Sequence, residues 1–215
     1  MAQIFSKRMN RILPELAMGG VLFLAFATFF FWYWGSPKYT DVGYRPEQPV
    51  KFSHKLHAGD LGMDCRYCHT NVEVAEHANI PSTETCMNCH TLIGIDNPKV
   101  APIRESWNTG EPIEWVRVHM LPDYAYFAHG PHIQAGVSCI ECHGNVREME
   151  VVTQVEPLSM GWCLECHRNP DDKLRPVSEI TNMQWTPPTD HAEFVAQWKT
   201  DKNIKPPEDC SACHR

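Results

Sequence analysis

The ten cysteines of this 215-residue chain all belong to five copies of one motif, Cys-x-x-Cys followed directly by histidine. Two thiols at this spacing can add to the two vinyl groups of one porphyrin, and the next histidine then lies beneath the iron as its proximal ligand. The motifs are Cys65/Cys68/His69, Cys86/Cys89/His90, Cys139/Cys142/His143, Cys163/Cys166/His167 and Cys210/Cys213/His214. The sequence therefore predicts five covalently attached haem c groups.

Paired cysteines also occur in zinc ribbons, disulfide frameworks and thioredoxin-like redox sites. Each of these arrangements fixes the spacing of the cysteines but not the identity of the residue after the second one. Here that residue is histidine in all five motifs. The pattern consequently favours haem attachment over zinc binding or structural disulfides.

An internal repeat organises the first four motifs. Residues 52–90 and 127–167 share the pattern Phe-x-His-x-x-His followed by two attachment motifs, and equivalent positions are offset by 74 to 77 residues. Such near-constant offsets indicate a duplicated two-haem module. The fifth motif, at residues 210–214, is appended after the second copy.

The repeat also supplies candidates for the second axial ligand that a low-spin electron-transfer iron requires. His54 and His57 in the first copy, like His129 and His132 in the second, are three residues apart and become neighbours on a helical turn. We predict that all four are distal ligands, each pair serving two adjacent haems.

Four distal histidines leave one iron without a second ligand. The remaining candidates are His77, His119, His191, Met120, Met160 and Met183. His119 ranks first among the histidines because it ends an alternating apolar run, and Met183 is the leading sulfur ligand. Met160 is tethered too closely to Cys163 and is expected to pack in the core, whereas His77 and His191 lie in polar segments and are expected at the surface.

Composition predicts a fold with a small side-chain core. The chain has 17 prolines and 12 glycines, and its formal net charge of −7 argues against nucleic acid as a partner. We expect a multihaem cytochrome c fold, mostly irregular and built around its haems, with short α-helices and little β structure. Residues 91–123 are expected to form a linker with one short strand near Trp115 to His119, and residues 192–199 a brief helix.

Residues 16–34 form an uncharged apolar stretch of the length needed to cross a bilayer as a helix. Lys7, Arg8 and Arg11 precede it, so the positive-inside rule places residues 1–15 in the cytoplasm and residues 35–215 on the periplasmic or outer face. A cleaved signal peptide would share the basic and apolar parts, but this stretch is longer than a signal core and no Ala-x-Ala site precedes Ser36. We therefore predict a retained single-pass anchor in the cytoplasmic membrane.

A membrane-anchored array of haems could be an electron relay or a multihaem reductase. A reductase needs an iron with an open coordination site. Seven non-proximal histidines face five irons in this chain, and no Cys-x-x-Cys-Lys variant marks an active haem. The sequence therefore favours a relay that is not catalytic by itself.

The chain resembles the pentahaem subunit of alternative complex III over nearly its whole length. The resemblance lies in the anchor, the five motifs, Phe52 to His57, the Trp115 to His132 segment and the Met-Gly-Trp-Cys run at 160–163. It implies a relay within a quinol:electron-acceptor oxidoreductase. The implied partners are an iron–sulfur and molybdopterin-like large subunit, a polytopic quinol-binding membrane subunit, and a monohaem cytochrome, copper protein or terminal oxidase as acceptor.

A second family also combines one membrane anchor with a multihaem head. Its members are stand-alone quinol dehydrogenases that feed periplasmic nitrate or nitrite reductases. They usually carry four haems, so the duplicated histidine pairs and the fifth motif count against this alternative.

Overall fold

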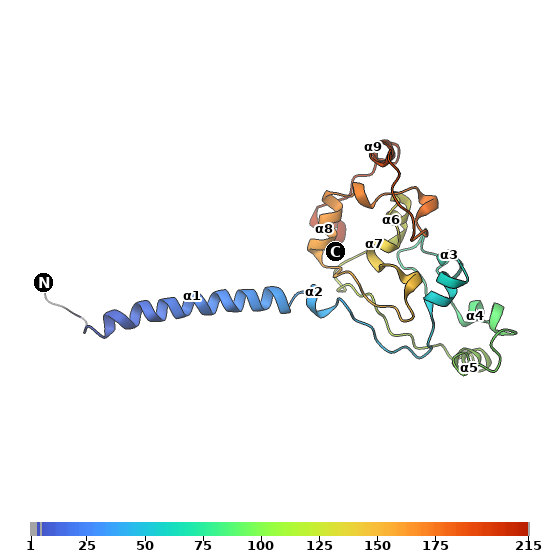
Figure 1. Ribbon diagram of the computed structural model, residues 1–215, viewed down its shortest axis with the longest axis horizontal. Coiled ribbons are helices and arrows are strands. Elements are labelled where there is room, and N and C mark those ends of the chain that lie inside the picture. The colour runs from blue at the N-terminus through green and yellow to red at the C-terminus, as the bar shows by residue number, and fades with distance from the viewer. Residues whose placement is uncertain (1–3, 5, 215) are drawn as a thin grey trace. The chain divides into compact units, whose positions relative to one another are not determined.

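The computed structural model describes residue 4 and residues 6–214, and the chain divides into two compact units, residues 1–41 and 42–215. The first unit contains α1 (Met9–Trp34) and the short α2 (Pro37–Thr40) (Figure 1). The predicted cytoplasmic segment 1–15 lies partly outside the described residues.

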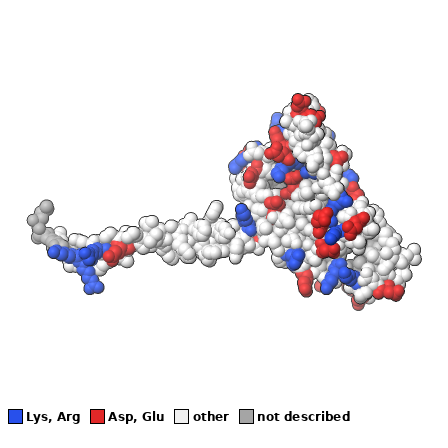
Figure 2. All heavy atoms as spheres, in the orientation of Figure 1, with Lys and Arg blue, Asp and Glu red and all other residues white. Residues whose placement is uncertain are grey.

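Helix α1 has 26 residues, none of them buried within the chain, and is long and apolar enough to cross a membrane. At 1.5 Å per residue it spans about 39 Å, more than the roughly 30 Å of a bilayer core. It begins seven residues before the predicted apolar stretch and includes Pro14. The charged side chains gather near its start and its middle is free of them (Figure 2), while Phe29 and Tyr33 pair near its end with centroids 5.8 Å apart.

The second unit is built of short helices joined by irregular chain, and no strand occurs among its described residues. Two isolated antiparallel bridges, Ala125 with His214 and Val137 with Leu174, are the β pairing that the structure records there. The helical elements are η1 (Lys55–Asp60), α3 (Cys65–Cys68), α4 (Thr83–His90), α5 (Ala101–Thr109), α6 (His129–Ala135), α7 (Ile140–His143), η2 (Val146–Glu148), α8 (Met160–Arg168), η3 (Asp171–Lys173), η4 (Val177–Glu179), α9 (His191–Asp201) and α10 (Cys210–Cys213). This architecture confirms the predicted fold class.

Each attachment motif coincides with a short helix, and three of these helices begin at a capping side chain. Asp64 accepts a hydrogen bond from the backbone N–H of Arg66 at the start of α3. Ser159 and Asp209 cap α8 and α10 in the same way. Because such caps satisfy backbone donors that a short helix leaves free, they stabilise the helical turn that carries the cysteines of these three motifs.

Residues 91–123 differ from the predicted linker, because they contain helix α5. Its Ile103 and the preceding Val100 pack with Val50 and Met87 in a small core cluster, which stabilises a helix that its own composition favours weakly. Gly110, with φ of +76°, ends the helix in the left-handed conformation that glycine adopts easily.

The expected strand near Trp115 to His119 is also wrong, since this stretch has no strand partner. The side chain of Gln48 takes the place of a partner strand. Its Nε2 donates to the carbonyl of Val116 at 2.7 Å, and its Oε1 accepts from the N–H of Val116 at 2.9 Å. Both backbone groups are satisfied, so the segment stays extended without a sheet. The brief helix expected at residues 192–199 is confirmed within α9.

The side-chain core of the second unit is small. A second cluster joins Val72, Ile133 and Ile180, and the chain exposes 15295 Å² in all. A compact protein of this mass exposes about 10,000 Å². Part of the excess belongs to α1, which has no buried residue, and the two small clusters are the apolar core of the second unit.

Candidate functional site

The two Phe-x-His-x-x-His segments have nearly the same side-chain geometry. In the first, the ring of Phe52 lies edge-on to His54 at 4.8 Å and almost parallel to His57 at 4.4 Å. In the second, Phe127 lies edge-on to His129 at 4.8 Å and tilted over His132 at 4.5 Å. The aromatic ring therefore fixes both histidines of each pair, which explains why the phenylalanine belongs to the repeat.

The two repeats dock on each other reciprocally. In the first, the N–H of Lys55 donates to the carbonyl of Met149, and in the second, the N–H of Gly130 donates to the carbonyl of Ala75. Lys55 and Gly130 differ by 75 residues and Ala75 and Met149 by 74, matching the repeat offset. Each histidine pair is thus supported by the partner repeat, with an internal two-fold relation.

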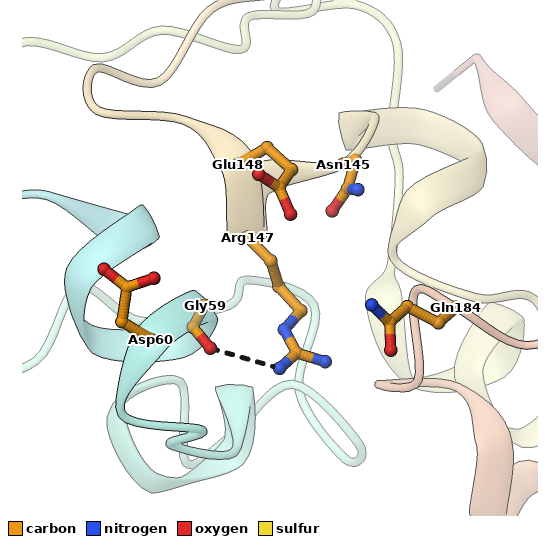
Figure 3. Close-up of a pocket in the computed structure, with 6 residues that line it drawn as sticks. All are labelled: Gly59, Asp60, Asn145, Arg147, Glu148 and Gln184. Carbon is orange, nitrogen blue, oxygen red and sulfur yellow. Dashed lines mark hydrogen bonds between the residues drawn. The ribbon is translucent and has the colours of Figure 1, made fainter.

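A polar pocket marks one of these two contacts. It lies between η1 and η2, where the guanidinium of Arg147 donates from Nε to the carbonyl of Ala58 at 2.9 Å and reaches the carbonyl of Gly59 (Figure 3). Arg147 therefore satisfies the end of η1 and fixes the second repeat against the first.

Most of the predicted ligand histidines have Nδ1 close to a backbone carbonyl. Nδ1 lies within 2.6–3.0 Å of a backbone carbonyl in His57, His69, His90, His129, His132, His167 and His214. A proton on Nδ1 leaves the lone pair of Nε2 free, and this arrangement is the one by which proteins orient histidines toward a metal. His191 differs, since its Nε2 contacts the carbonyl of Leu174 at 2.8 Å.

Three of the predicted distal histidines lie opposite a histidine of an attachment motif. The ring centroids are 6.3 Å apart for His57 and His90, 6.4 Å for His129 and His143, and 6.1 Å for His132 and His167. Two imidazoles bound through Nε2 to opposite sides of one iron, with metal–nitrogen distances of about 2 Å, have centroids about 6.3 Å apart. These side chains therefore fit a haem iron between them.

Burial keeps two of the predicted ligands, His54 and His143, in the neutral form. Burial lowers the pKa of His54 to about 4, with further contributions from neighbouring His69 and His57. Burial likewise lowers the pKa of His143 to about 3, assisted by His119 and His129. Both imidazoles are neutral at physiological pH, the form that binds iron.

The electrostatic neighbours of the cysteines place the motifs in a single order. The thiols of Cys65 and Cys139 hydrogen-bond to each other, which lowers the pKa of Cys65 to about 7, and this contact joins the first motif to the third. Elsewhere burial is the largest cause of a raised cysteine pKa, and the charge of a nearby thiol in another motif adds to it: Cys86 for Cys68, Cys166 for Cys142, and Cys213 for Cys163. The resulting sequence of neighbours is second, first, third, fourth and fifth motif.

The two candidates for the fifth distal ligand lie in different environments. Nε2 of His119 is 3.4 Å from Nδ1 of His143, in the third motif. Met183 is buried, with 6% of its surface exposed. Met120 and Met160 are exposed, so the expectation that Met160 packs in the core is wrong: it is the first residue of α8 and belongs to neither core cluster. His77 is exposed, as expected for a surface histidine, whereas His191 is half-buried rather than exposed.

Sequence reasoning missed the groups that orient the ligands. The carbonyls of Asn79, Tyr124 and Pro207 hold the histidines of the first, fifth and fourth motifs. A backbone carbonyl gives no residue-type signal, so no pattern could have identified these positions. The only usable hint is their place in irregular chain, where carbonyls are free to bond.

Comparison with known proteins agrees with this site. Residues 50–96 and 125–215 match the family described as cytochrome c7 and related cytochrome c, and the matched ranges include all five motifs. The chain is also 35% identical over 170 residues to the multihaem cytochrome c subunit of menaquinone reductase from Nitratidesulfovibrio vulgaris (strain Hildenborough), covering 79% of this chain and 77% of that protein. The opposed histidines, the motifs and this similarity together establish that the chain belongs to the cytochrome c7-related family of multihaem c-type cytochromes.

Proposed function

We propose that the chain is an electron-relay subunit of a membrane-bound, quinone-linked oxidoreductase, with five covalently attached haems. The observation that carries the proposal is the set of three opposed histidine pairs with centroids 6.1–6.4 Å apart. An iron held by two histidines exchanges one electron at a time and offers no open site to a substrate. We therefore infer electron transfer rather than catalysis for this chain.

In this proposal the ten motif cysteines form the thioethers, and His69, His90, His143, His167 and His214 are the proximal ligands. Within each repeat the first distal histidine serves the first motif and the second serves the second. The three opposed pairs follow this rule, and the repeat extends it to His54 with His69. For the fifth iron, Nε2 of His119 is directed at His143, so we carry Met183 forward as the candidate.

The order in which cysteines of different motifs are electrostatic neighbours supports the proposed path. Electrons pass from haem to haem in one linear order. This order runs from the second motif through the first, third and fourth to the fifth, or in reverse. Cys89 and Cys210, at the two ends of this order, are exposed, whereas Cys139 and Cys142 in its centre are more enclosed. The ends are therefore where redox partners would approach.

We propose further that α1 anchors the subunit in the cytoplasmic membrane, with the N-terminus in the cytoplasm and the haem unit on the periplasmic face. The resemblance to alternative complex III implies a polytopic quinol-binding subunit and an iron–sulfur and molybdopterin-like large subunit as partners. Electrons would then leave quinol and reach a soluble cytochrome, copper protein or terminal oxidase.

The similar protein from N. vulgaris supports a second direction. Its name describes a menaquinone reductase, in which electrons enter the quinone. The same linear order of haems can serve either direction, because the potentials of the partners determine the flow. The second candidate function is thus a relay that carries electrons inward to menaquinone.

The membrane complex that contains the full chain distinguishes these directions. A menaquinol analogue is mixed with the oxidised complex and, separately, a menaquinone analogue with the reduced complex, while haem absorbance is followed. We expect haem reduction by the quinol for the first function and haem oxidation by the quinone for the second. The chain purified alone should do neither; rapid reduction of that sample by quinol would favour a stand-alone quinol dehydrogenase instead.

A further inference from the structure

The histidine of the third motif is oriented differently from the other four. His69, His90, His167 and His214 have Nδ1 on a backbone carbonyl at 2.6–3.0 Å. Nδ1 of His143 instead faces Nε2 of His119 at 3.4 Å, and the two rings are nearly perpendicular with centroids 4.4 Å apart.

The direction of this contact follows from the ligand geometry. A histidine bound to iron through Nε2 carries its proton on Nδ1, so His143 is the donor and His119 the acceptor. His129 lies opposite His143 with its centroid at 6.4 Å and a nearly parallel ring. The space for the third iron is therefore between His129 and His143, and His119 lies on the Nδ1 edge of His143 rather than at an iron-binding position there.

The segment that carries His119 is held in place by separate contacts. Gln48 makes both of its hydrogen bonds to the backbone of Val116, and Trp115 packs against the first core cluster. Further along, the carbonyl of Tyr124 contacts His214. The segment lies in the stretch 97–124, between the two ranges that match the family.

We propose that His119 is a positioning residue that tunes the reduction potential of the third haem by accepting a hydrogen bond from its proximal ligand, His143. The proposal rests on the proposed function. A hydrogen bond that the Nδ1–H of a ligand donates makes the imidazole a stronger electron donor, which favours the ferric state and lowers the potential. Loss of the acceptor therefore raises the potential of this one haem.

The test uses the full-length holoprotein in detergent and a potentiometric titration of its haem absorbance. His119→Leu keeps the volume of the side chain and removes the acceptor, so about one fifth of the absorbance change should move to higher potential. His119→Gln keeps an acceptor oxygen near the position of Nε2 and should restore most of the original profile. Gln197→Ala, at an exposed position of α9, is the control and should leave all five transitions in place.

Spectra of the same samples separate this role from ligation. All five haems should stay attached by mass and low-spin by paramagnetic resonance in both His119 variants. One high-spin iron in His119→Leu would show that His119 is an axial ligand and overturn the proposal, as would equal shifts in the Leu and Gln variants or an unchanged titration. Gln48→Ala, which removes the two hydrogen bonds to Val116 but leaves His119 itself unchanged, gives an independent measurement and should raise the same transition by a smaller amount. Each of these outcomes leaves five attached haems to be counted. Failure of the proposal for His119 therefore does not decide whether the chain is an electron relay.

Discussion

The two repeats build the same histidine pair on different backbones. The first pair lies at the start of η1, a π-helical turn that His54 precedes and that contains His57, and the second pair lies within α6, an α-helix. The phenylalanine contacts nevertheless agree within 0.1 Å in their centroid distances. Ligand placement is thus determined by the i, i+3 spacing and the aromatic ring, and the helix type adapts to it.

The repeats differ most at the Nδ1 edge of their first distal histidine. Nδ1 of His129 contacts the carbonyl of Glu76 at 2.8 Å. Nδ1 of His54 is buried without a hydrogen-bond partner among the described residues. A buried donor without an acceptor costs about 1–3 kcal/mol, so the first repeat holds its ligand less firmly than the second.

Removing a distal ligand should have the largest effect. His54→Ala and His132→Ala should each leave one iron with a single protein ligand and convert one of five haems to high spin, with all five still attached. Optical and paramagnetic resonance spectra of the full holoprotein measure this. Unchanged low-spin spectra in both variants would refute the distal assignment in both repeats.

Glycine-to-alanine substitutions test how strongly the backbones of η1 and α6 are constrained. Gly136 ends α6 with φ of +95°, and an added Cβ would overlap the carbonyl of Arg175. At Gly59 in η1, a Cβ would lie 2.5 Å from the carbonyl of Arg147, without a positive φ. Gly136→Ala should therefore lower the free energy of unfolding by more than about 1 kcal/mol and by more than Gly59→Ala does.

Denaturant unfolding of the two holoproteins gives the comparison, with Gly161→Ala as a control because nothing lies within 4 Å of its added Cβ. A larger loss at Gly59 would mean that η1, rather than α6, is the more constrained element.

Phe52 and Phe127 should contribute equally to the stability of the two repeats. Phe52→Leu and Phe127→Leu each remove the ring that contacts two histidines, at a cost of about 1 kcal/mol in aromatic packing. We expect equal losses of stability and equal broadening of the low-spin signals of the two haems in each repeat. A loss in only one variant would show that the shared geometry has different energetic weight in the two copies.

The smallest predicted effect concerns the residue that precedes the first cysteine of each repeat. This residue is Asp64 in the first copy and Ser138 in the second. Hydrogen bonds from Arg66 lower the pKa of Asp64 from 3.8 to about 2. Because the folded pKa lies below the unfolded one, the carboxylate stabilises the fold above about pH 4, and this contribution is lost as the pH falls through 2. Ser138 donates to the carbonyl of Ile180 instead and has no such dependence.

Asp64→Asn should thus be slightly less stable than the parent at pH 7 and equal to it only below about pH 2, as measured by thermal unfolding at several pH values. Asp172→Asn, at an exposed carboxylate, serves as the control. A stability difference that grows toward acid pH would contradict the assigned sign.

The sequence was informative where function depends on local spacing. Histidines three residues apart and the Cys-x-x-Cys-His motifs carry their geometry within a few residues, so the opposed pairs could be anticipated. Helix α5 was missed because its stability comes from packing on Val50 and Met87 rather than from its own composition. The acceptor of each Nδ1 proton was missed because it depends on tertiary folding.

The reciprocal docking of Lys55 on Met149 and of Gly130 on Ala75 bears on the origin of the chain. A solitary copy of the repeat would lack the support that its histidine pair receives from the other copy. An ancestral polypeptide with one copy could satisfy these bonds by self-association about a two-fold axis. Gene fusion would then have converted a homodimer interface into the interior of a single subunit, after which the two halves were free to diverge.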